Sequence, residues 1–585
     1  MRVFLDLMWF FKMHKLRYLA GITLLMLVAI LSLIPPHAVG VIIDDMQAKT
    51  LTSGVLVYWV LVLGATAAII YVLRYLWRIL LFGAAMQLAA LLRERLYQHF
   101  TKLSPQFYHQ NRIGDLMAHS TNDVQAIEQT ATDGVLTLVD SITTGVVVIA
   151  TMASTISWKL TLIALIPMPL MALATAHYGK LMHERFHKAQ AAFADITEKT
   201  QENIAGVRVI KAFGQEDVET QSFADLSLDV VQKNIAVARI DALFDPTISL
   251  FVGVSYLLSV GFGAYFVTRG AMNIGSLTTF TLYLGQLIWP MLAFGWLFNI
   301  VERGRASNDR VRTLLAVKED IVNRDGAIDR VPTGDISYDL HTFTYPHTTT
   351  PVLRDIHFDL AKGQTLGIVG RTGTGKTTLL KLLLREFDCT DGDISIGGDS
   401  IYRVTLDALR GAIAYVPQDH FLFSASIANN IAFARATAQM PEIQQAAKMA
   451  VIHDDIVRFP EGYATLVGER GVTLSGGQKQ RLSIARALLM EAEILILDDS
   501  LSAVDAKTES MILEALRQER RNKTTLIATH RLSAVEQADL ILVLEDGQIA
   551  ERGTHDELMR QGGLYAAMYE RQQLEVLVEH GGVSA

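Results

Sequence analysis

Long apolar stretches fill the first half of the chain and end near residue 300. A helix needs about 20 mostly apolar residues to cross a bilayer. Stretches of this kind predict six membrane-spanning helices, over residues 19–43, 56–80, 134–156, 158–177, 247–267 and 277–299. The third and fourth are separated only near Ser157. The pattern therefore predicts a helical membrane domain over residues 19–305.

Two intervening segments, 83–132 and 178–240, are more polar but keep apolar residues at helical spacing. We expect them to continue the membrane helices well beyond the bilayer. Residues 1–18 mix Trp9 and Phe10 with charged residues, which predicts an interfacial amphipathic helix rather than a disordered tail. A small-residue cleavage site does not follow the first apolar run, so a cleaved signal peptide is not expected.

The distribution of basic residues predicts the orientation in the membrane. Lysines and arginines are frequent in both long polar segments, whereas the short opposite loops hold little beyond Lys49, Lys159 and Arg269. Basic segments stay on the cytoplasmic side. With six spans, both termini and the C-terminal half are then also expected in the cytosol.

Charges and prolines interrupt some spans. Asp140 lies in the third predicted span, and Arg74 and Arg78 lie in the second. A charge in a span is a candidate functional group, but an ion pair of Asp140 with either arginine near the cytosolic end would be structural, which we favour. Kinks are predicted at Pro35, Pro36, Pro167, Pro169, Pro246 and Pro290.

Composition and charge limit the classes of partner and metal site that the chain could have. Half of the residues are apolar, only 19% are charged, and the net charge is −8. This balance gives no electrostatic support to a nucleic-acid partner. Cys389 is the single cysteine, which excludes an intrachain disulfide and a cysteine-rich metal site.

The first motif in the second half of the chain is a phosphate-binding loop. The apolar segment 365–370 predicts a buried strand, a glycine-rich loop follows, and 377–387 predicts a helix. Backbone amides of such a loop and the helix N-terminus bind phosphates, the lysine reaches the β- and γ-phosphates, and the hydroxyl after it binds Mg²⁺. The residues assigned to ATP are Gly370, Arg371, Thr372, Gly373, Thr374, Gly375, Lys376, Thr377 and Thr378.

A second buried strand, 493–498, ends in a carboxylate. A carboxylate at the end of a strand beside a phosphate loop is suited to hold Mg²⁺. Asp498 is therefore predicted to bind Mg²⁺ together with Thr377.

The segment Leu474-Ser475-Gly476-Gly477-Gln478 resembles the signature of ATP-binding cassette transporters. With the two motifs above, nearly the whole chain resembles an exporter in which six spans are fused to one α/β P-loop cassette. This resemblance implies a linker over 306–335, a cassette over 336–570 and a C-terminal tail over 571–585. It also implies that two cassettes meet head to tail, with each ATP between the phosphate loop of one and the signature of the other. Ser475 is suited to cap the helix that begins near Gln478.

The resemblance implies roles for further residues. Tyr345 resembles the aromatic residue that stacks on adenine, although a tyrosine beside a strand is more often part of a core. Gln418 resembles the glutamine that contacts Mg²⁺ and the attacking water, and His530 resembles the histidine that contacts the γ-phosphate. Residues 502–505 resemble the loop that crosses to the partner cassette, and residues 468–471 resemble an exporter-specific loop. The coupling helices are expected at 112–117 with 122–123, and at 206–214.

Asp499 departs from the family pattern, in which a glutamate directly follows the Mg²⁺ aspartate and acts as the hydrolytic base. Its carboxylate is shorter by one methylene, and a displacement of about 1 Å can cost on the order of 10²-fold in rate. The pocket on this chain is therefore expected to bind ATP well and hydrolyse it slowly.

An intact signature beside a weak base predicts a heterodimer. The partner half-transporter would supply the glutamate, and Ser475, Gly476, Gly477 and Gln478 would complete its pocket. A homodimer in which Asp499 suffices is the alternative. The resemblance implies ATP-driven multidrug-type export in a bacterial inner membrane; a lipid flippase and a nucleotide-gated channel are the other hypotheses.

Overall fold

The structure is a computed structural model that describes residues 2–346, 348–389, 391–468 and 474–579, with the side chains of 294, 295 and 576–579 left aside. It divides into two compact units. One comprises Met1–Lys102 with Tyr108–Val317, and the other comprises Leu103–Phe107 with Lys318–Ala585. We refer to them as the helical unit and the cassette unit.

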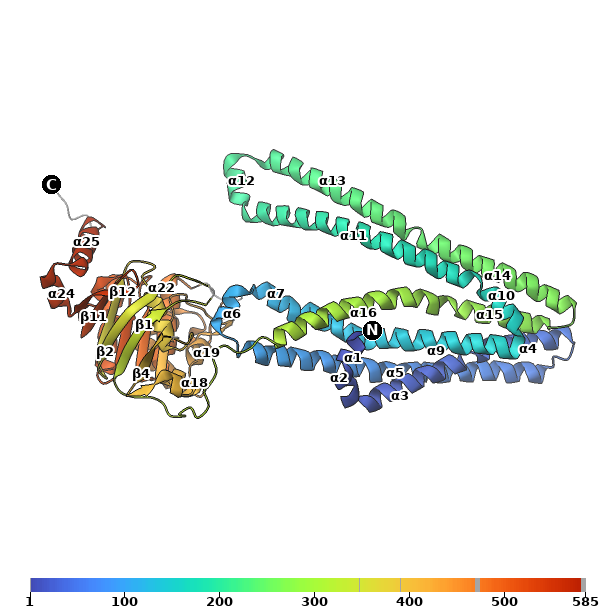
Figure 1. The fold of residues 1–585 in the computed structure, drawn as a ribbon, viewed down its shortest axis with the longest axis horizontal. Helices are drawn as coiled ribbons and strands as arrows, with labels where there is room; N and C mark the ends of the chain where they lie inside the picture. Colours follow the sequence, from blue (N-terminus) through green and yellow to red (C-terminus); the bar gives the residue numbers. More distant parts are fainter. Residues whose placement is uncertain (1, 347, 390, 469–473, 580–585) are drawn as a thin grey trace. The chain divides into compact units, whose positions relative to one another are not determined.

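The helical unit consists of long helices joined by short breaks (Figure 1). Its helices are α1 (Arg2–Asp6), α2 (Met8–Met13), α3 (Lys15–Leu31), α4 (Ile34–Gln47), α5 (Ser53–Phe100), α6 (Pro105–Gln110), α7 (Ile113–Ala118), α8 (Val124–Gln129), α9 (Val135–Thr151), α10 (Trp158–Leu165), α11 (Pro167–Ala205), α12 (Val207–Phe213), α13 (Glu216–Asp241), α14 (Phe244–Thr268), α15 (Ile274–Gln286) and α16 (Ile288–Leu315). The π-helical segments η1 (His119–Asp123), η2 (Thr130–Gly134) and η3 (Met152–Ser157) continue α7, α8 and α9.

Among the described residues, helical runs long and apolar enough to cross a membrane are Lys15–Gln47, Ser53–Phe100, Ile113–Leu165, Glu216–Thr268 and Ile274–Leu315. The predicted fourth span, 158–177, comprises α10 and the first part of α11, with the predicted kink at Pro167 between them. Ser157 has an extended backbone (φ −164°, ψ 116°), and α10 and α11 are separated at Ile166. Figure 1 shows α9 and α11 running in opposite directions on either side of α10. The fourth crossing is thus kinked, because Pro167 cannot donate the hydrogen bond that would continue α10.

The predicted kinks coincide with helix starts. Pro35, Pro167, Pro246 and Pro290 lie in the first turns of α4, α11, α14 and α16. The first backbone N–H groups of a helix have no partner within the helix, so proline costs little there. The residue before each of these helices keeps right-handed helical backbone angles, so the prolines mark kinks within longer helical runs.

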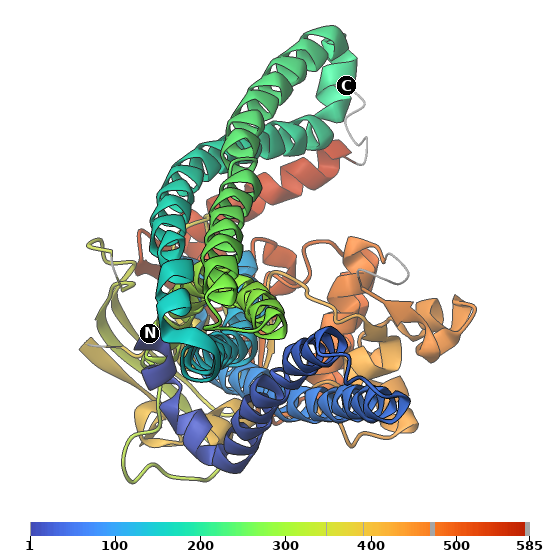
Figure 2. The ribbon, with the colours of Figure 1, turned by 90° about the vertical axis from the view of Figure 1, so that its right-hand side faces the viewer.

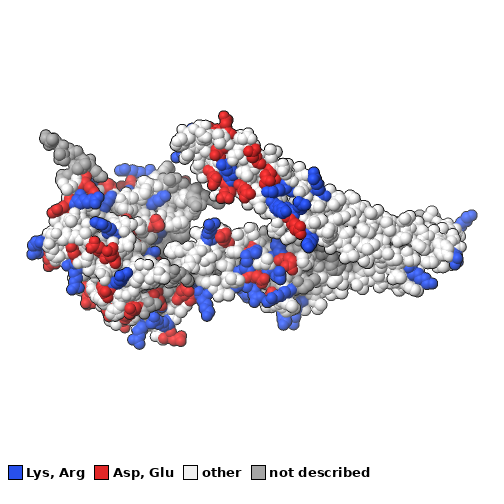
Figure 3. Space-filling view, turned by 45° about the horizontal axis from the view of Figure 1, so that its top comes forward, with Lys and Arg blue, Asp and Glu red and all other residues white. Residues whose placement is uncertain are grey.

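Outer faces of the spans are apolar and exposed. Leu61, Tyr71 and Leu257 are exposed by 67%, 74% and 72%. Figure 3 shows that the part of the helical unit around α4, α10, α14 and α15 is almost free of charged side chains, except at its end. Exposed apolar area of this extent marks a surface that is covered by another apolar phase. Lipid around the spans provides that phase.

A cluster of charged and polar side chains around Asp123 holds two of the helical segments together. Asp123 accepts hydrogen bonds from Arg310 (Nη2, 2.5 Å) and Ser307 (2.9 Å), and His119 lies 2.6 Å away. This cluster joins η1 to α16. In the spans, the Asp140 carboxylate accepts a hydrogen bond from Thr144 and is acted on by the charge of Arg74. The ion pair expected for Asp140 stays a prediction.

Helices α11 and α13 pack against each other along their length and lean away from the other helices (Figures 1 and 2). The predicted coupling segment 206–214 forms α12 at the turn between them, and Gly214 ends it in the left-handed conformation (φ 61°). The predicted segment 112–117 forms α7, with Arg112 just before it. At the other end of the unit, α16 continues to Leu315, into the predicted linker.

The cassette unit contains two main sheets. Its strands are β1 (Ile336–Phe343), β2 (Leu353–Leu360), β3 (Thr365–Gly370), β4 (Asp391–Ile396), β5 (Asp399–Ser400), β6 (Ile413–Val416), β7 (Ala425–Ser426), β8 (Leu466–Val467), β9 (Ile494–Asp498), β10 (Thr524–Ala528), β11 (Leu540–Glu545) and β12 (Gln548–Gly553). Its helices are α17 (Lys376–Leu383), η4 (Ile401–Arg403), α18 (Leu406–Ala412), α19 (Ile427–Ala432), α20 (Met440–Met449), α21 (His453–Arg458), η5 (Gly462–Ala464), α22 (Gly476–Leu489), α23 (Ala506–Glu519), η6 (Leu532–Ala534), α24 (His555–Gln561) and α25 (Leu564–Glu579).

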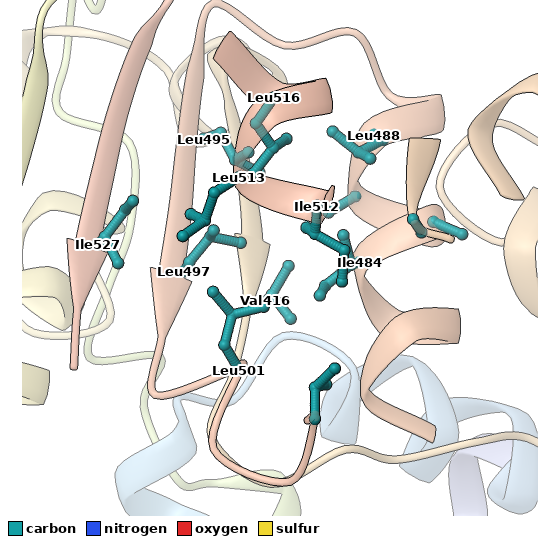
Figure 4. Packing of buried hydrophobic residues seen from close by; sticks show 14 of the residues in the cluster. Val416, Ile484, Leu488, Leu495, Leu497, Leu501, Ile512, Leu513, Leu516 and Ile527 are labelled. Atoms are coloured by element: carbon teal, nitrogen blue, oxygen red, sulfur yellow. The ribbon is translucent and has the colours of Figure 1, made fainter. Parts of the chain in front are cut away.

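The order of strands in the larger sheet is β12-β11-β3-β10-β9-β6, and β11, β3, β10, β9 and β6 are parallel. The other sheet is antiparallel, in the order β2-β1-β4-β5. Figure 4 shows one core beside the parallel sheet, in which strand residues meet residues of α22 and α23. The labelled side chains are Val416, Ile484, Leu488, Leu495, Leu497, Leu501, Ile512, Leu513, Leu516 and Ile527.

Local signals in the sequence account for several boundaries. The predicted strand 365–370 is β3, and the predicted 493–498 is β9 with one residue fewer. The Asp546-Gly547 turn joins β11 to β12, with φ of 47° and 80°. Positive φ at both central residues is the geometry that makes Asp-Gly a hairpin signal.

Candidate nucleotide-binding site

The parallel strands place the predicted site residues along one edge of the sheet. Strand β3 leads into the phosphate loop, β10 precedes His530, β9 ends at Asp498, and β6 ends two residues before Gln418. Carboxyl ends of parallel strands lie at the same edge, where ligands bind in open α/β sheets. Segments far apart in the sequence thereby share one site.

Glycines shape the phosphate loop. Gly373 and Gly375 have φ of 88° and 97°, which other residues rarely adopt. A Cβ at Gly370 would lie 2.4 Å from the Leu544 carbonyl oxygen, whereas the space beside Gly373 is open. Arg371, Thr372 and Gly373 are exposed. A side chain at any of these three glycine positions would be strained, and the loop is open to a ligand.

Lys376 is buried at the start of α17, and its Nζ donates to the carbonyl oxygens of Gly370 (2.8 Å) and Arg371 (2.9 Å). Burial lowers the pKa of Lys376, and the carboxylates of Asp499 and Asp498 oppose this change. The loop thus holds a cation beside the positive end of the α17 dipole. This arrangement fits a chain of phosphates.

Thr377 and Asp498 meet as predicted, with Thr377 Oγ1 donating to Asp498 Oδ1 at 3.0 Å. Tyr415 on β6 donates to the other oxygen, Oδ2, at 3.2 Å. Burial raises the pKa of Asp498, and the two hydroxyl donors act in the opposite direction. A hydroxyl and a carboxylate oxygen are suitable Mg²⁺ ligands, so these residues fit the ion.

Sequence analysis missed Tyr415, although its position three residues before Gln418 is visible in the chain. Only the pairing of β6 with β9, which places Tyr415 beside Ile496, brings the phenol to Asp498. We infer that Tyr415 is a positioning residue, because its hydroxyl holds one oxygen of the Asp498 carboxylate.

Tyr415→Phe tests this role. Loss of one neutral hydrogen bond, about 1 kcal/mol, should raise the Mg²⁺ concentration for half-maximal ATP binding about fivefold. The pKa of Asp498 should rise further, since one of the donors that lower it is removed. Asp498 is then protonated at a higher pH than in the wild type. The pH below which Mg²⁺-dependent ATP binding fails should therefore move upward. Binding of a fluorescent ATP analogue, titrated with Mg²⁺ at several pH values, measures both effects.

Tyr463→Phe is the control, because it removes a hydroxyl that contacts His453 in the same unit. An unchanged Mg²⁺ requirement in Tyr415→Phe would show that the phenol does not support the carboxylate.

Asp499 is held in an unusual backbone conformation. Its φ is 45°, and its N–H donates to the Ala528 carbonyl oxygen at 2.8 Å. Its carboxylate is electrostatically coupled to Lys376, His530 and His420. A non-glycine residue with positive φ persists only where its surroundings enforce it.

The two histidines near Asp499 are expected to be neutral at pH 7. Burial lowers the pKa of His530, and the cation of Lys376 lowers it further. Burial also lowers the pKa of His420, a residue that sequence analysis did not single out. Gln418, two residues before it, is exposed at the same edge. Neutral imidazoles can both accept and donate hydrogen bonds.

Tyr345 packs edge-on against Phe343 and Phe387, at centroid distances of 5.1 and 5.0 Å. Its hydroxyl lies 2.9 Å from Thr378 Oγ1 in the helix that follows the phosphate loop. The Tyr345 side chain is half-buried. It thus packs against the core and also keeps an exposed part. Thr374 bonds within the loop, to the Arg371 carbonyl oxygen at 2.9 Å.

The signature forms a helix start. Ser475 caps α22 by accepting from the Gln478 N–H at 3.3 Å, and Gln478 Oε1 accepts from the Ser475 N–H at 3.0 Å. The predicted cap is confirmed, although the helix begins at Gly476. A Cβ on Gly477 would lie 2.8 Å from the Ala503 carbonyl oxygen. Ser475 and Gly476 are exposed, so the amino end of α22 is accessible.

The loop 502–505 packs beside this helix. Gln480 donates to Ser502 Oγ (3.1 Å) and accepts from the Ala503 N–H (2.9 Å). Arg531, which directly follows His530, donates to carbonyl oxygens of Ser502 and Val504 at 2.8 Å. Sequence analysis missed this link. In the predicted loop 468–471, residues 469–471 lie outside the described residues.

Comparisons with known proteins agree with this architecture. The family model described as ABC transporter transmembrane region matches residues 18–291, and the model described as ABC transporter matches residues 353–502. The multidrug resistance-like ATP-binding protein MdlA of Escherichia coli is 48% identical over 581 residues, or 99% of this chain and 98% of the relative. The ATP-dependent lipid A-core flippase of Syntrophus aciditrophicus is 36% identical over 85% of this chain and 82% of its own length.

A solved structure of a bacterial Atm1-family ABC exporter with ATP bound matches with a TM-score of 0.80 and 27% identity. The match covers 95% of this chain and 98% of that chain. The predicted combination of a helical membrane domain and an α/β ATPase cassette is confirmed. The chain belongs to the ATP-binding cassette exporters, and it is a multi-pass, ATP-hydrolysing half-transporter of the multidrug-resistance-like type.

Proposed function

We propose that this chain exports hydrophobic or amphipathic compounds across the inner membrane of a bacterium, as one half of a heterodimer. The partner is an MdlB-like half-transporter that carries glutamate where this chain has Asp499. Both termini and the cassette lie in the cytosol, as the excess of basic residues in the long polar segments supports. The resemblance to MdlA supports the multidrug-type cargo.

Different residues of the site bind the phosphates, the adenine and the Mg²⁺ of ATP. Lys376 and the loop from Gly370 to Thr378 bind the phosphates, and Tyr345 stacks on adenine. Thr377, Asp498 and Gln418 hold Mg²⁺, which neutralises charge on the phosphates when bound. His530 contacts the γ-phosphate as a neutral imidazole.

The signature acts on the other pocket of the dimer. Ser475, Gly476, Gly477 and Gln478 present the amino end of α22 to the γ-phosphate bound by the partner. The capping box leaves this end preformed and exposed, and its dipole favours an anion. This chain thereby completes a competent pocket even though its own base is short.

The backbone at Asp499 is the observation that carries the proposal of a slow pocket. An aspartate could compensate for its missing methylene if the main chain moved toward the water. The 2.8 Å hydrogen bond from its N–H to Ala528 and the neighbouring strand β10 resist that movement. We infer that Asp499 holds the attacking water poorly, so that hydrolysis depends on the partner's glutamate.

Coupling to the membrane domain proceeds through α7 and α12, the short helices at the ends of the long extensions. ATP can change the state of the membrane domain only if it binds one state better than another. Closure of the two cassettes on ATP supplies this difference, and hydrolysis with product release resets the transporter.

Reconstitution with the partner tests the pairing. The chain alone should hydrolyse ATP slowly, and the pair should hydrolyse it quickly. Replacing the partner's glutamate by glutamine should abolish most of that activity, whereas Asp499→Ala should change it little. Phosphate release from purified protein in lipid nanodiscs measures all four cases. Fast hydrolysis by the chain alone that is lost in Asp499→Ala would favour the homodimer.

Movement of lipid is the second candidate, and the flippase relative favours it. Inside-out vesicles separate the alternatives. Export accumulates a fluorescent hydrophobic cation in the vesicle lumen on ATP, and a flippase changes the leaflet of a labelled lipid without a lumenal gradient. A nucleotide-gated channel would only dissipate an existing gradient.

A further inference from the structure

Two histidines and an aspartate share the outer face of the antiparallel sheet. Asp339 and His341 are two residues apart on β1, so their side chains point to the same face. His357 on β2 is the register partner of Asp339. All three are exposed, whereas Tyr338, which precedes Asp339, and Leu340, which lies between Asp339 and His341, are buried on the opposite face.

The three side chains are close enough to share one ion. His357 Nδ1 lies 2.7 Å from Asp339 Oδ1, and the imidazole centroids of His341 and His357 are 5.5 Å apart. One ligand atom from each residue lies within 4.8 Å of the others. Ligands at about 2.0–2.1 Å from tetrahedral zinc are separated by about 3.3 Å, so small side-chain rotations would close the site. The side chains of His357 and Asp339 are exposed by 46% and 67%, which leaves room for such rotations.

The surrounding face is acidic. Asp393 on β4 lies opposite Asp339 on the side away from His357, and Asp391 lies opposite Thr342. Asp393 accepts a hydrogen bond from Ser400 at 2.6 Å, which fixes its carboxylate. Carboxylates next to a pair of imidazoles strengthen the attraction for a dication and can accept hydrogen bonds from bound water.

We propose that Asp339, His341 and His357 bind a divalent transition-metal ion of the zinc class. Two imidazoles and one carboxylate suit zinc, copper or nickel, whereas magnesium and calcium prefer a shell of oxygens. The remaining coordination positions face solvent and hold water. The site is separate from the phosphate loop, because the opposite face of β1 is the one that packs on α17, with Tyr338 donating to the Leu379 carbonyl oxygen at 3.0 Å.

The ion would join β1 to β2 across their outer face. Strand β1 ends at Phe343, two residues before Tyr345. Metal binding should therefore stabilise the antiparallel sheet and the segment that leads to the adenine side of the nucleotide site. The proposal concerns this surface alone, and it stands whether or not the chain forms a heterodimer.

Equilibrium dialysis of the full-length chain in detergent tests it, with Zn²⁺ as the probe and without a histidine tag. Millimolar Mg²⁺ is present throughout to occupy the site at Asp498. The wild-type protein should retain one Zn²⁺ per chain that EDTA removes. His341→Gln, His357→Gln and Asp339→Asn should each weaken this binding at least about tenfold. With Co²⁺ in place of Zn²⁺, the visible absorption of a protein-bound ion should appear and be lost in the same variants.

His183→Gln is the matched control. His183 and His187 on α11 form another exposed pair, with Nε2 atoms 3.1 Å apart and ring centroids 4.4 Å apart. Zinc binding should survive this change. Loss of zinc in His183→Gln but not in the sheet variants, or no stoichiometric zinc in the wild type, would overturn the proposal. The sheet variants alter exposed side chains, so their metal-free melting temperatures should match the wild type.

Discussion

Asp499→Glu should raise ATP hydrolysis by the purified single chain by on the order of 10²-fold. The added methylene extends the carboxylate by about the distance that separates a poor base position from a good one. The longer side chain supplies the extra reach, so the backbone of residue 499 can keep its hydrogen bond to the Ala528 carbonyl oxygen. Phosphate release at saturating ATP, in nanodiscs, measures the change.

Asp556→Glu is the matched control, since it makes the same chemical change in the exposed first turn of α24. It should leave hydrolysis unchanged. If Asp499→Glu also leaves the rate unchanged, the short carboxylate is not what limits this pocket. Rapid hydrolysis by the unmodified chain would contradict the slow pocket directly.

Lys376→Met should reduce hydrolysis by about 10²–10³-fold and weaken ATP binding at this pocket. The ammonium is buried in the loop, where its attraction for phosphate is screened less than in water. Methionine has a similar length and keeps the packing of the stem, but it has no charge and no N–H donor. The Asp499→Glu background makes the loss of hydrolysis measurable, and a fluorescent ATP analogue reports binding in either background.

Lys362→Met serves as the control for this second change. Lys362 is an exposed lysine of the cassette unit that pairs with Glu493 at 3.1 Å. Its loss should not alter nucleotide binding. Equal affinities in Lys376→Met and Lys362→Met would show that the lysine of the loop does not contact the phosphates.

Local parts of the site could be predicted because their causes are local. The turn at Asp546-Gly547, the cap formed by Ser475 and the strand 365–370 each depend on a few adjacent residues. The meeting of Thr377 with Asp498 was also predictable, since a carboxylate at the end of a strand beside a phosphate loop is suited to hold Mg²⁺ together with the hydroxyl of that loop. The boundary between the third and fourth spans near Ser157 and the kink at Pro167 were also predictable, since an N-capping serine and a proline are local signals, and a helix begins at each position.

Contacts between distant strands could not be predicted in this way. Tyr415 meets Asp498 only through the pairing of β6 with β9, and Arg531 reaches the loop 502–505 only after the chain has passed through β10. His357 is opposite Asp339 only in one register, and a shift of one residue would move it to the buried face.

The sequence by itself determined the membrane and cassette halves, the phosphate loop, the signature and the shortened base at Asp499, because each is defined by residue type and short spacing. The tertiary structure alone decided which side chains share an edge or a face, and how firmly the backbone of Asp499 is held. Strand order and register set those distances, and they depend on packing of the whole sheet rather than on any local pattern.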